Sequence, residues 1–350
     1  MNNIAANRQW RVARYPESGE AVSRDLFSWT TDAVPDPAEG EFLVRTVCLA
    51  LGPAQRGYLA EATQDAFLQP VAIGDVMRGR GVGRIIKSRH PDYPDGAIFV
   101  GSLGWQDYSL QQPRGKEFVY STRLVTEPIA PLSGELGTLG QAGATAYFGL
   151  REAGQVQAND HVLVSAAAGG LGSCAGQIAR ALGASNVVGI AGGPEKCLWL
   201  IDELGFNAAI DYQSQDVGER LRALFPHGID VFFDSVGGDL LNTALGHLAM
   251  HARVAVAGFI ATDYDPQAAE GPLNYRNLVS KRASMQGFVF FDYWDRYAEA
   301  AAQLRDWHRR GLLRSTEHIG EGLEQMPDAL AGLFTGANRG VSICRVSPDE

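Results

Sequence analysis

A turn rich in small residues could bind the phosphates of a nucleotide. It reads Ser165-Ala-Ala-Ala-Gly-Gly-Leu-Gly172 and stands between an apolar, strand-like run and a stretch with helical periodicity. Backbone N–H groups at the start of a helix lack partners inside the helix, and the helix dipole attracts negative charge to the same point. In the pattern G-x-G-x-x-G, Gly169 would let the backbone approach a pyrophosphate and Gly172 would let the helix pack closely, while Ala167 replaces the first glycine. An ordinary tight turn between a strand and a helix is the alternative.

The residues after the next predicted strand distinguish NADPH from NADH. An NAD enzyme usually carries an acidic residue at this strand tip, where it binds the ribose 2′-hydroxyl. Here the strand continues into Gly192-Gly-Pro-Glu-Lys196, with no carboxylate at the tip and Lys196 on the first turn of the following helix. An ammonium group there suits a 2′-phosphate, so NADPH is the predicted cofactor. Lys196 could also be an ordinary solvated lysine, and Glu195 need not face the phosphate.

An α/β domain is needed to bring these residues to the ends of neighbouring strands. Continuous Val/Ile runs alternate with amphipathic stretches, which is typical of a doubly wound parallel sheet covered on both faces. The predicted strands are His161–Ala166, Asn186–Ala191, Ala208–Tyr212, Ile229–Asp234 and Val254–Phe259. The predicted helices are Gly134–Ala153, a helix from the glycine turn to Gly183, Pro194–Leu204, Val217–Phe225, Leu240–Met250 and Trp294–Arg310.

The two ends of the chain differ from its middle in their pattern of apolar and turn-forming residues. Residues 1–130 consist of short β-like runs and Gly/Pro turns, and residues 315–350 resemble them. We therefore predict a β-rich domain of residues 1–130, completed by 315–350, with a Rossmann domain of residues 131–314 inserted into it.

Composition excludes several other classes of protein. The net charge of −10 and the lack of a Lys/Arg stripe argue against nucleic-acid binding. Met1–Trp10 has no apolar signal core, and no apolar run approaches the ~20 residues of a membrane span. The four cysteines are scattered without a CxxC pair, which predicts neither disulfides nor a structural zinc lobe and favours the reducing cytoplasm.

Seven motifs in a fixed order together resemble a known family. They are Gly140–Leu150, the glycine turn, Gly192–Lys196, Asp211-Tyr212, Asp234–Gly238, Met285–Val289 and Gly336–Gly340. Their order is similar to that of the medium-chain dehydrogenases/reductases. Within that superfamily, the chain resembles the zinc-independent branch of prostaglandin reductase (leukotriene B4 12-hydroxydehydrogenase), plant double-bond reductases and bacterial curcumin reductase.

The resemblance implies a GroES-like catalytic domain, a homodimer and a specific reaction. This reaction is the NADPH-dependent reduction of the C=C bond of an α,β-unsaturated carbonyl compound. Hydride is delivered to the β-carbon and the enolate is protonated at the α-carbon. A carbonyl or quinone reductase on the same scaffold is the nearest alternative, and a non-catalytic NADPH-binding sensor is an alternative from another class.

The resemblance also implies a set of cofactor-binding residues. Lys196 and Tyr212 would hold the 2′-phosphate end, and the glycine turn would hold the pyrophosphate. Gly258 and Phe259 would border the bound cofactor. Phe288–Phe290 would flank the nicotinamide, with Thr145 and Asn338 near its ribose and phosphate. The set is Thr145, Ala168, Gly169, Gly170, Leu171, Gly172, Gly193, Lys196, Tyr212, Ser235, Gly258, Phe259, Phe288, Val289, Phe290 and Asn338. Purely structural roles stay open for Tyr212, for the Phe288–Phe290 run and for Asn338, which lies in a Gly-rich turn.

A metal site is not predicted. Zinc-using relatives carry a Gly-His-Glu ligand motif, and the matching place here is Gly74-Asp-Val-Met-Arg-Gly79, which has neither the histidine nor the glutamate. Without three convergent His, Cys or carboxylate ligands there is no catalytic zinc tetrahedron.

The donor that stabilises the enolate departs from the family pattern. Relatives read Asp-Pro-Tyr-Met-Arg-Gly where this chain has Gly52-Pro-Ala-Gln-Arg-Gly57, and Ser280 takes the place of a second family tyrosine. The remaining candidate donors are Tyr275, our first choice, then Tyr58 and Tyr293, together with the ribose 2′-hydroxyl of the cofactor. We predict an apolar pocket walled by Tyr58, Phe288, Phe290 and Tyr293, and a roomier one because Ala54 replaces the family tyrosine.

Overall fold

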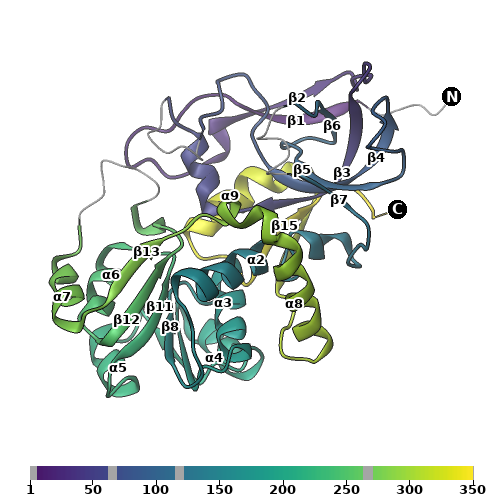
Figure 1. Ribbon diagram of the computed structural model, residues 1–350. Helices are drawn as coiled ribbons and strands as arrows, with labels where there is room; N and C mark the ends of the chain where they lie inside the picture. Colours follow the sequence, from purple (N-terminus) through teal and green to yellow (C-terminus); the bar gives the residue numbers. More distant parts are fainter. Residues whose placement is uncertain (1–5, 62–68, 115–121, 263–270, 350) are drawn as a thin grey trace. The chain divides into compact units, whose positions relative to one another are not determined.

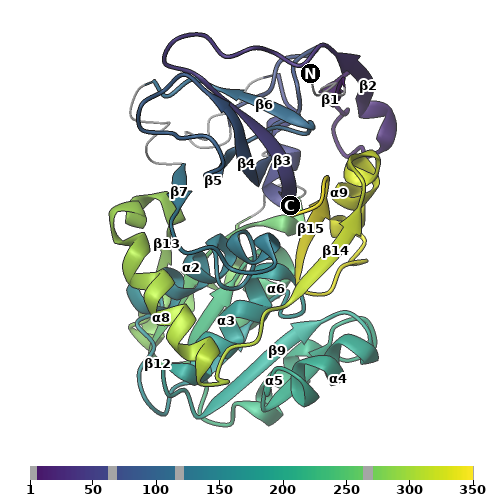
Figure 2. The same cartoon turned by 90° about the vertical axis from the view of Figure 1, so that its right-hand side faces the viewer.

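The computed structural model describes residues 6–61, 69–114, 122–262 and 271–349 (Figures 1 and 2). The chain forms two compact units, which are described separately. The first unit comprises Met1–Leu136, His318–Ala337 and Ser342–Glu350, and the second comprises Gly137–Glu317 and Asn338–Val341.

The first unit is built on antiparallel strands. β1 and β2 pair with each other, and the larger sheet has the order β14-β15-β3-β4-β5-β7, with β6 pairing β3. The strands are β1 Asn7–Val12, β2 Phe27–Asp32, β3 Phe42–Leu51, β4 Arg80–Ser88, β5 Ile98–Ser102, β6 Tyr108–Gln111, β7 Arg123–Val125, β14 Glu317–Glu321 and β15 Val341–Arg345. Its core gathers large side chains such as Phe42, Phe99 and Trp105, which are fully buried. The C-terminal strands therefore complete the sheet that the N-terminal segment begins.

The second unit is a parallel sheet with helices. Its order is β10-β9-β8-β11-β12-β13, and every neighbouring pair is parallel. The strands are β8 His161–Val164, β9 Asn186–Ala191, β10 Ala208–Asp211, β11 Ile229–Asp234, β12 Leu248–Val256 and β13 Ser284–Gly287. In order of appearance this is 3-2-1-4-5-6, the order of the Rossmann fold, whose switch point lies between β8 and β11. The predicted Rossmann sheet is confirmed.

Helices cover the parallel sheet and connect its strands. The α-helices are α2 Gln141–Phe148, α3 Gly170–Ala181, α4 Pro194–Asp202, α5 Val217–Leu224, α6 Gly238–Leu245, α7 Asn277–Lys281 and α8 Tyr297–Arg309, and α9 Met326–Phe334 belongs to the first unit. Shorter turns are 3-10 helices at Arg24–Leu26, Pro53–Tyr58, Leu132–Glu135, Ile260–Thr262, Leu273–Arg276, Phe290–Arg296 and Leu323–Gln325, and a π-helix at Gly149–Ala153.

Local sequence explains where these helices begin. Pro194 lies in the first turn of α4, where its missing N–H costs nothing. The Asp216 carboxylate caps α5 by accepting the Glu219 backbone N–H at 2.8 Å. The helix ends on the sheet side are thereby fixed close to the strand ends that precede them.

Three predicted helices differ from the helices of the structure by more than two residues at one end or both. The helix predicted at Leu240–Met250 ends at Leu245, because β12 begins at Leu248 and its apolar residues pair with β11 instead. The predicted strand Val254–Phe259 is correspondingly the end of that longer strand. The helix predicted from Gly134 starts as an α-helix only at Gln141, since the preceding residues are rich in glycine, the poorest helix former after proline. The helix predicted from Trp294 begins at Tyr297, after a 3-10 turn.

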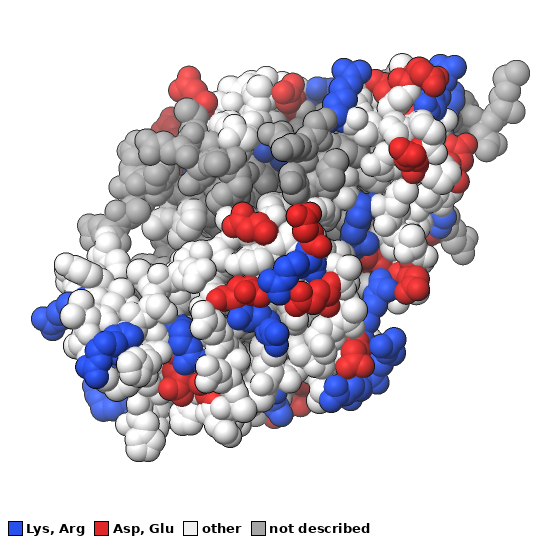
Figure 3. Space-filling model, in the orientation of Figure 1, with Lys and Arg blue, Asp and Glu red and all other residues white. Residues whose placement is uncertain are grey.

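Surface charge is mixed rather than segregated on the face shown in Figure 3. Basic and acidic side chains alternate there among the described residues, and no continuous basic area covers that face. Within the described parts of the chain, no helix combines the length and the hydropathy needed to cross a membrane.

Candidate cofactor site and catalytic residues

The glycine turn joins β8 to α3 in the second unit. Gly169 lies at the N-cap of α3, so the first turn of the helix, Gly170–Gly172, presents backbone N–H groups that have no acceptor within the helix. A Cβ atom at Gly172 would stand 2.4 Å from the Ala166 carbonyl oxygen and 2.7 Å from the Ala167 Cα. Gly172 is therefore required for the close approach of the helix to its own turn, and the site keeps the geometry of an anion-binding helix end.

The glycine turn is contacted by a segment that lies far away in the sequence, around Gly340. The Gly340 N–H donates to the Ala168 carbonyl at 2.8 Å, and a Cβ at Gly340, which has a φ of +79°, would lie 2.5 Å from the Thr316 carbonyl. The Asn338 Nδ2 donates to the Gly340 carbonyl at 3.0 Å. The structure thus brings Asn338 close to the glycine turn, and its role toward a cofactor stays a prediction.

The carboxyl ends of β8 and β11 are linked by a buried carboxylate. Asp234 accepts hydrogen bonds from the Ser165 hydroxyl at 2.7 Å and from two backbone N–H groups of the next turn at 3.0 Å. Burial raises the pKa of Asp234. The Ser165 Oγ in turn accepts the Ser235 N–H at 2.8 Å, which positions the predicted Ser235 at the switch point. Sequence analysis missed Asp234 as a positioning residue, although it lies inside a family motif.

The turn after β9 forms a small polar cradle. Gly193 has a φ of +87°, and its backbone N–H donates to the Asp211 carboxylate at 2.8 Å. A Cβ at Gly192 would stand 3.2 Å from the Tyr212 hydroxyl and 2.9 Å from the Gln213 amide nitrogen, so both side chains lie over the turn. Lys196 follows on the first turn of α4, partly buried. Tyr212 therefore lies over the turn that leads into Lys196, and the roles of both residues toward a 2′-phosphate stay predictions.

Two charged groups of this cradle have shifted pKa values. Hydrogen bonds from Ser214, Gly193 and Gln213 hold the pKa of Asp211 below its ordinary value, which keeps it ionised. Desolvation lowers the pKa of Lys196. Asp211 shapes the turn without having been predicted as a site residue; its place at the end of a predicted strand, within one of the family motifs, is the signal that could have indicated it.

The residues predicted around the nicotinamide also belong to the second unit. A Cβ at Gly149 would lie 2.3 Å from the Phe288 ring, which shows close packing of that ring against the π-helical turn. Phe290 is 4% exposed and contacts the rings of Phe291 and Trp294. The Thr145 hydroxyl donates to the Gln141 carbonyl at 2.8 Å, within its own helix. These side chains have packing roles, and their roles toward a cofactor stay predictions, as do those of Val289, Gly258 and Phe259.

The three candidate tyrosines lie in different surroundings. Tyr275, in the second unit, is 64% exposed. Tyr293, also there, stacks on Phe148 with ring centroids 4.8 Å apart, and burial raises its pKa. Tyr58 belongs to the first unit, where the Arg78 guanidinium lies 4.7 Å from its ring centroid. The predicted apolar pocket draws residues from both units and stays a prediction.

The segment that matches the zinc ligands of relatives contains one buried side chain. Met77 is fully buried, Asp75 is exposed and Val76 is intermediate. Over the described residues, no group of three His, Cys, Asp or Glu side chains is placed to hold a metal ion. The residues present do not fit a zinc site there.

Comparison with known proteins gives matches over both units. The family model described as the N-terminal domain of oxidoreductase matches residues 8–119, and the model described as zinc-binding dehydrogenase matches residues 170–306. The NADPH-dependent curcumin reductase of Escherichia coli (strain K12) is 37% identical over 349 residues, covering 98% of each chain. The 2-alkenal reductase (NADP(+)-dependent) of Nicotiana tabacum is 34% identical, covering 96% of this chain and 95% of its own.

A solved structure shows the same architecture. CurA from Vibrio vulnificus in complex with NADPH matches with a TM-score of 0.89 and 35% identity, over 97% of this chain and 99% of its own. This likeness, the matched N-terminal domain and the parallel sheet confirm the predicted fold class, a GroES-like β-rich domain with a Rossmann sheet.

Proposed function

Because this chain belongs to the medium-chain dehydrogenase/reductase family, in the branch of the NADP-dependent curcumin and alkenal reductases, we propose that it reduces the C=C bond of α,β-unsaturated carbonyl compounds with NADPH. The observation that carries the proposal is the polar cradle of Gly193, Lys196 and Tyr212 beside the glycine turn. It offers a cation and hydroxyl where a 2′-phosphate would lie and helix N–H groups where a pyrophosphate would lie.

The protein's part in the reaction is to bind, orient and stabilise charge. NADPH, when bound, supplies the hydride. The first turn of α3 would hold the pyrophosphate, and Asp234 fixes the carboxyl ends of β8 and β11 to each other. After a hydride has added to the β-carbon, negative charge develops on the carbonyl oxygen, and a hydrogen-bond donor is needed to stabilise it. The α-carbon of the resulting enolate then takes a proton.

A product assay tests this function. Oxidation of NADPH and NADH is followed against enals, linear enones, cyclic enones and quinones, with identification of each product. A saturated ketone or aldehyde is the expected product. An allylic alcohol or a quinol as the main product would replace the proposal with a carbonyl or quinone reductase. Tight NADPH binding without oxidation across the panel would indicate the non-catalytic sensor.

Tyr275 is the first candidate for the enolate donor. A phenol can donate to an enolate oxygen while remaining protonated, so Tyr275→Phe is expected to lower kcat by on the order of 10²-fold. The measurement is kcat with a saturating linear enone, with Tyr58→Phe and Tyr293→Phe assayed in parallel. An unchanged kcat in Tyr275→Phe removes this assignment and passes it to whichever of the other two variants loses activity.

The pH dependence of cofactor use follows from Lys196. Its ammonium binds a 2′-phosphate only while protonated, and desolvation lowers its pKa. We expect kcat/KM for NADPH to fall as the pH rises through this lowered pKa, at a lower pH than an ordinary lysine would allow. For NADH, which lacks the 2′-phosphate, kcat/KM should stay constant over the same range of pH. A parallel decline with both cofactors would contradict the role of Lys196.

The reaction is proposed to need no metal. Asp75 and Val76 stand where relatives carry zinc ligands, so dialysis against a chelator is expected to leave kcat unchanged. Metal analysis of the active enzyme serves as the control. Loss of activity that added zinc restores would contradict this proposal.

A homodimeric state and a cytoplasmic location complete the proposal. The dimer rests on the family resemblance, and the cytoplasmic location rests on the scattered thiols, among which Cys48, Cys174 and Cys344 are buried. Sedimentation of the purified protein tests the dimer directly.

A further inference from the structure

Three buried hydroxyl groups of the second unit form a hydrogen-bonded chain beside the start of α3. Thr138 precedes α2, Ser173 lies near the start of α3, and Thr316 directly precedes β14. Thr138 and Ser173 are 0% exposed and Thr316 is 7% exposed. The Thr316 Oγ1 lies 3.2 Å from the Thr138 Oγ1 and 3.0 Å from the Ser173 Oγ. Thr316 therefore joins two segments that are 178 and 143 positions away from it in the sequence.

The surrounding groups determine the direction of this hydroxyl chain. The Thr138 hydroxyl oxygen accepts the Thr316 backbone N–H at 3.1 Å and the Cys174 thiol at 3.6 Å, which uses both of its lone pairs. Its proton is therefore donated to the Thr316 hydroxyl. The Ser173 hydroxyl donates to the Gly170 carbonyl at 3.2 Å, so the Thr316 proton is donated to the Ser173 oxygen. The chain thus runs from Thr138 through Thr316 and Ser173 and ends on the carbonyl of the first residue of α3.

Backbone hydrogen bonds hold Thr316 beside the same helix. Its carbonyl accepts the Val341 N–H at 2.7 Å, and the adjacent Gly340 N–H donates to the glycine turn at 2.8 Å. Two residues before Thr316, the Arg314 N–H donates to the side-chain oxygen of Gln177 at 2.7 Å. The Gln177 amide nitrogen donates back to the Arg314 carbonyl at 3.3 Å. The segment around Thr316 is therefore attached both to α3 and to the segment that contacts the glycine turn.

We propose that Thr316 is a positioning residue for the dinucleotide cofactor, acting through Ser173 on the first turn of α3. The backbone N–H groups of that turn bind a pyrophosphate only while they point at it, so a small displacement of the helix weakens binding. Buried hydrogen bonds that are all satisfied hold the turn in one position. This inference rests on the cofactor site of the proposed function.

Thr316→Val and Thr316→Ser test the proposal. Valine has the shape of threonine without its hydroxyl, so the Thr138 proton loses its acceptor and the Ser173 oxygen loses its donor. Thr316→Val is expected to raise Kd by about tenfold for NADPH and for NADH alike, because both carry the pyrophosphate. At saturating NADPH, kcat should change by less than about twofold, as expected when only binding is lost. Thr316→Ser, which restores the hydroxyl, should recover most of the affinity.

A fragment of the cofactor distinguishes positioning of α3 from a general loss of structure. Adenosine 2′-monophosphate carries the 2′-phosphate but no pyrophosphate, so its Kd should be the same in the wild type and in Thr316→Val. Calorimetric titration measures the Kd of all three ligands. Thermal unfolding identifies any variant that fails to fold. Should Thr316→Val fail to fold, Ser173→Ala gives the same reading, since it removes the last hydroxyl of the chain.

Thr243→Val is the matched control. It makes the same change of hydroxyl to methyl in the same unit, in α6. The Thr243 hydroxyl donates to the Asp239 carbonyl of its own helix at 2.8 Å. The affinities for NADPH, for NADH and for adenosine 2′-monophosphate should therefore stay those of the wild type.

The outcomes separate this inference from the proposed function. If NADPH binds but no unsaturated carbonyl compound is reduced, the reductase function is wrong, and the binding measurements still decide the role of Thr316. Unchanged affinity for both dinucleotides in a folded Thr316→Val protein would overturn the inference and leave the reductase function in place. An equal loss of affinity for adenosine 2′-monophosphate would do the same, because the hydroxyl would then support the whole unit. A wild-type protein that binds neither dinucleotide would overturn both.

Discussion

Replacing Lys196 with glutamate is expected to lower kcat/KM for NADPH on the order of 10³-fold and to leave kcat/KM for NADH unchanged. The variant removes a charge-assisted hydrogen bond, which costs about 1.5–3 kcal/mol, and places a like charge beside the phosphate, which costs several more. Since each ~1.4 kcal/mol is tenfold, the two effects together reach this size. The measurement is the ratio of kcat/KM for the two cofactors at saturating enone.

A control variant with the same change of charge elsewhere in the second unit distinguishes a local effect at Lys196 from an effect of the protein's net charge. Arg309→Glu alters the net charge equally at the end of α8, where the side chain is 74% exposed, and the cofactor ratio should not move. Lys196→Met should fall between the wild type and Lys196→Glu. Equal losses with NADPH and NADH in Lys196→Glu would show that the residue supports α4 and does not select the cofactor.

The second unit could be predicted in detail because the residues that determine each of its strands and turns lie close together in the sequence. β9 and β11 run over the same residues as predicted, since each is an unbroken apolar run bounded by turn residues. The glycine turn could be placed because a strand and a helix flank it directly. The parallel sheet places the carboxyl ends of β9 and β10 side by side, so the turn leading into Lys196 and the residue after β10, Tyr212, lie at the same edge of the sheet.

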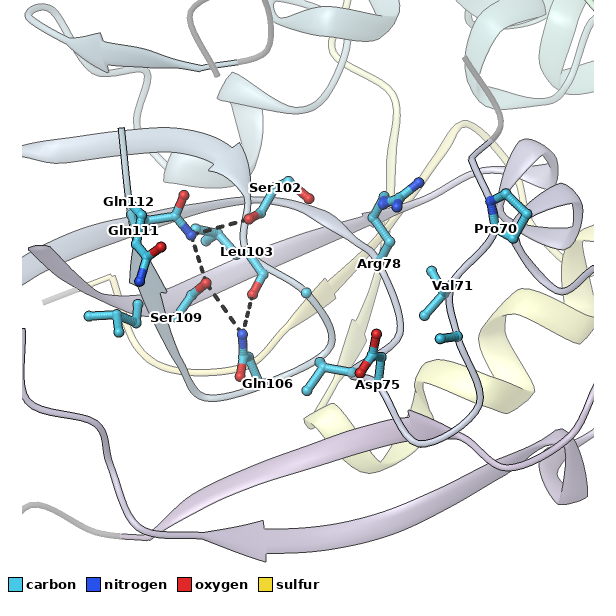
Figure 4. A pocket seen from close by; sticks show the side chains of 14 residues that line it. Pro70, Val71, Asp75, Arg78, Ser102, Leu103, Gln106, Ser109, Gln111 and Gln112 are labelled. Carbon is cyan, nitrogen blue, oxygen red and sulfur yellow. Dashed lines mark hydrogen bonds between the residues drawn. The ribbon is translucent and has the colours of Figure 1, made fainter. Parts of the chain in front are cut away.

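Features that depend on packing between distant residues could not be predicted. The bond from Ser165 to Asp234 joins residues 69 positions apart, and each looks ordinary in its own segment. The boundary between α6 and β12 was wrong because Leu245 and Leu248 satisfy a helical pattern and a strand pattern equally well. The pocket in the first unit that Figure 4 shows likewise needs side chains from three stretches of the chain, and no motif connects them.

Replacing Gly172 with valine is expected to abolish measurable cofactor binding. Even a single Cβ at this position would meet the Ala166 carbonyl oxygen at 2.4 Å, so α3 must move away from the turn that precedes it. Overpacking against backbone costs about 1–3 kcal/mol or more, and the displaced helix would no longer aim its N–H groups at the pyrophosphate. The loss should be the same for NADPH and NADH, because both carry that pyrophosphate. Calorimetric titration with each cofactor measures it.

The matched control is Gly271→Val in the same unit. Among the residues that the structure describes, none comes within 4 Å of a Cβ placed at Gly271, and its φ lies outside the left-handed region, so binding and stability should stay near those of the wild type. Far-ultraviolet circular dichroism and thermal unfolding separate a folded Gly172→Val protein that cannot bind from one that is unfolded. Since each kcal/mol lowers Tm by roughly 2–4 °C in domains of roughly 150–250 residues, a folded variant with a moderately reduced Tm is expected. Normal affinity in that folded variant would show that the first turn of α3 is not the pyrophosphate site.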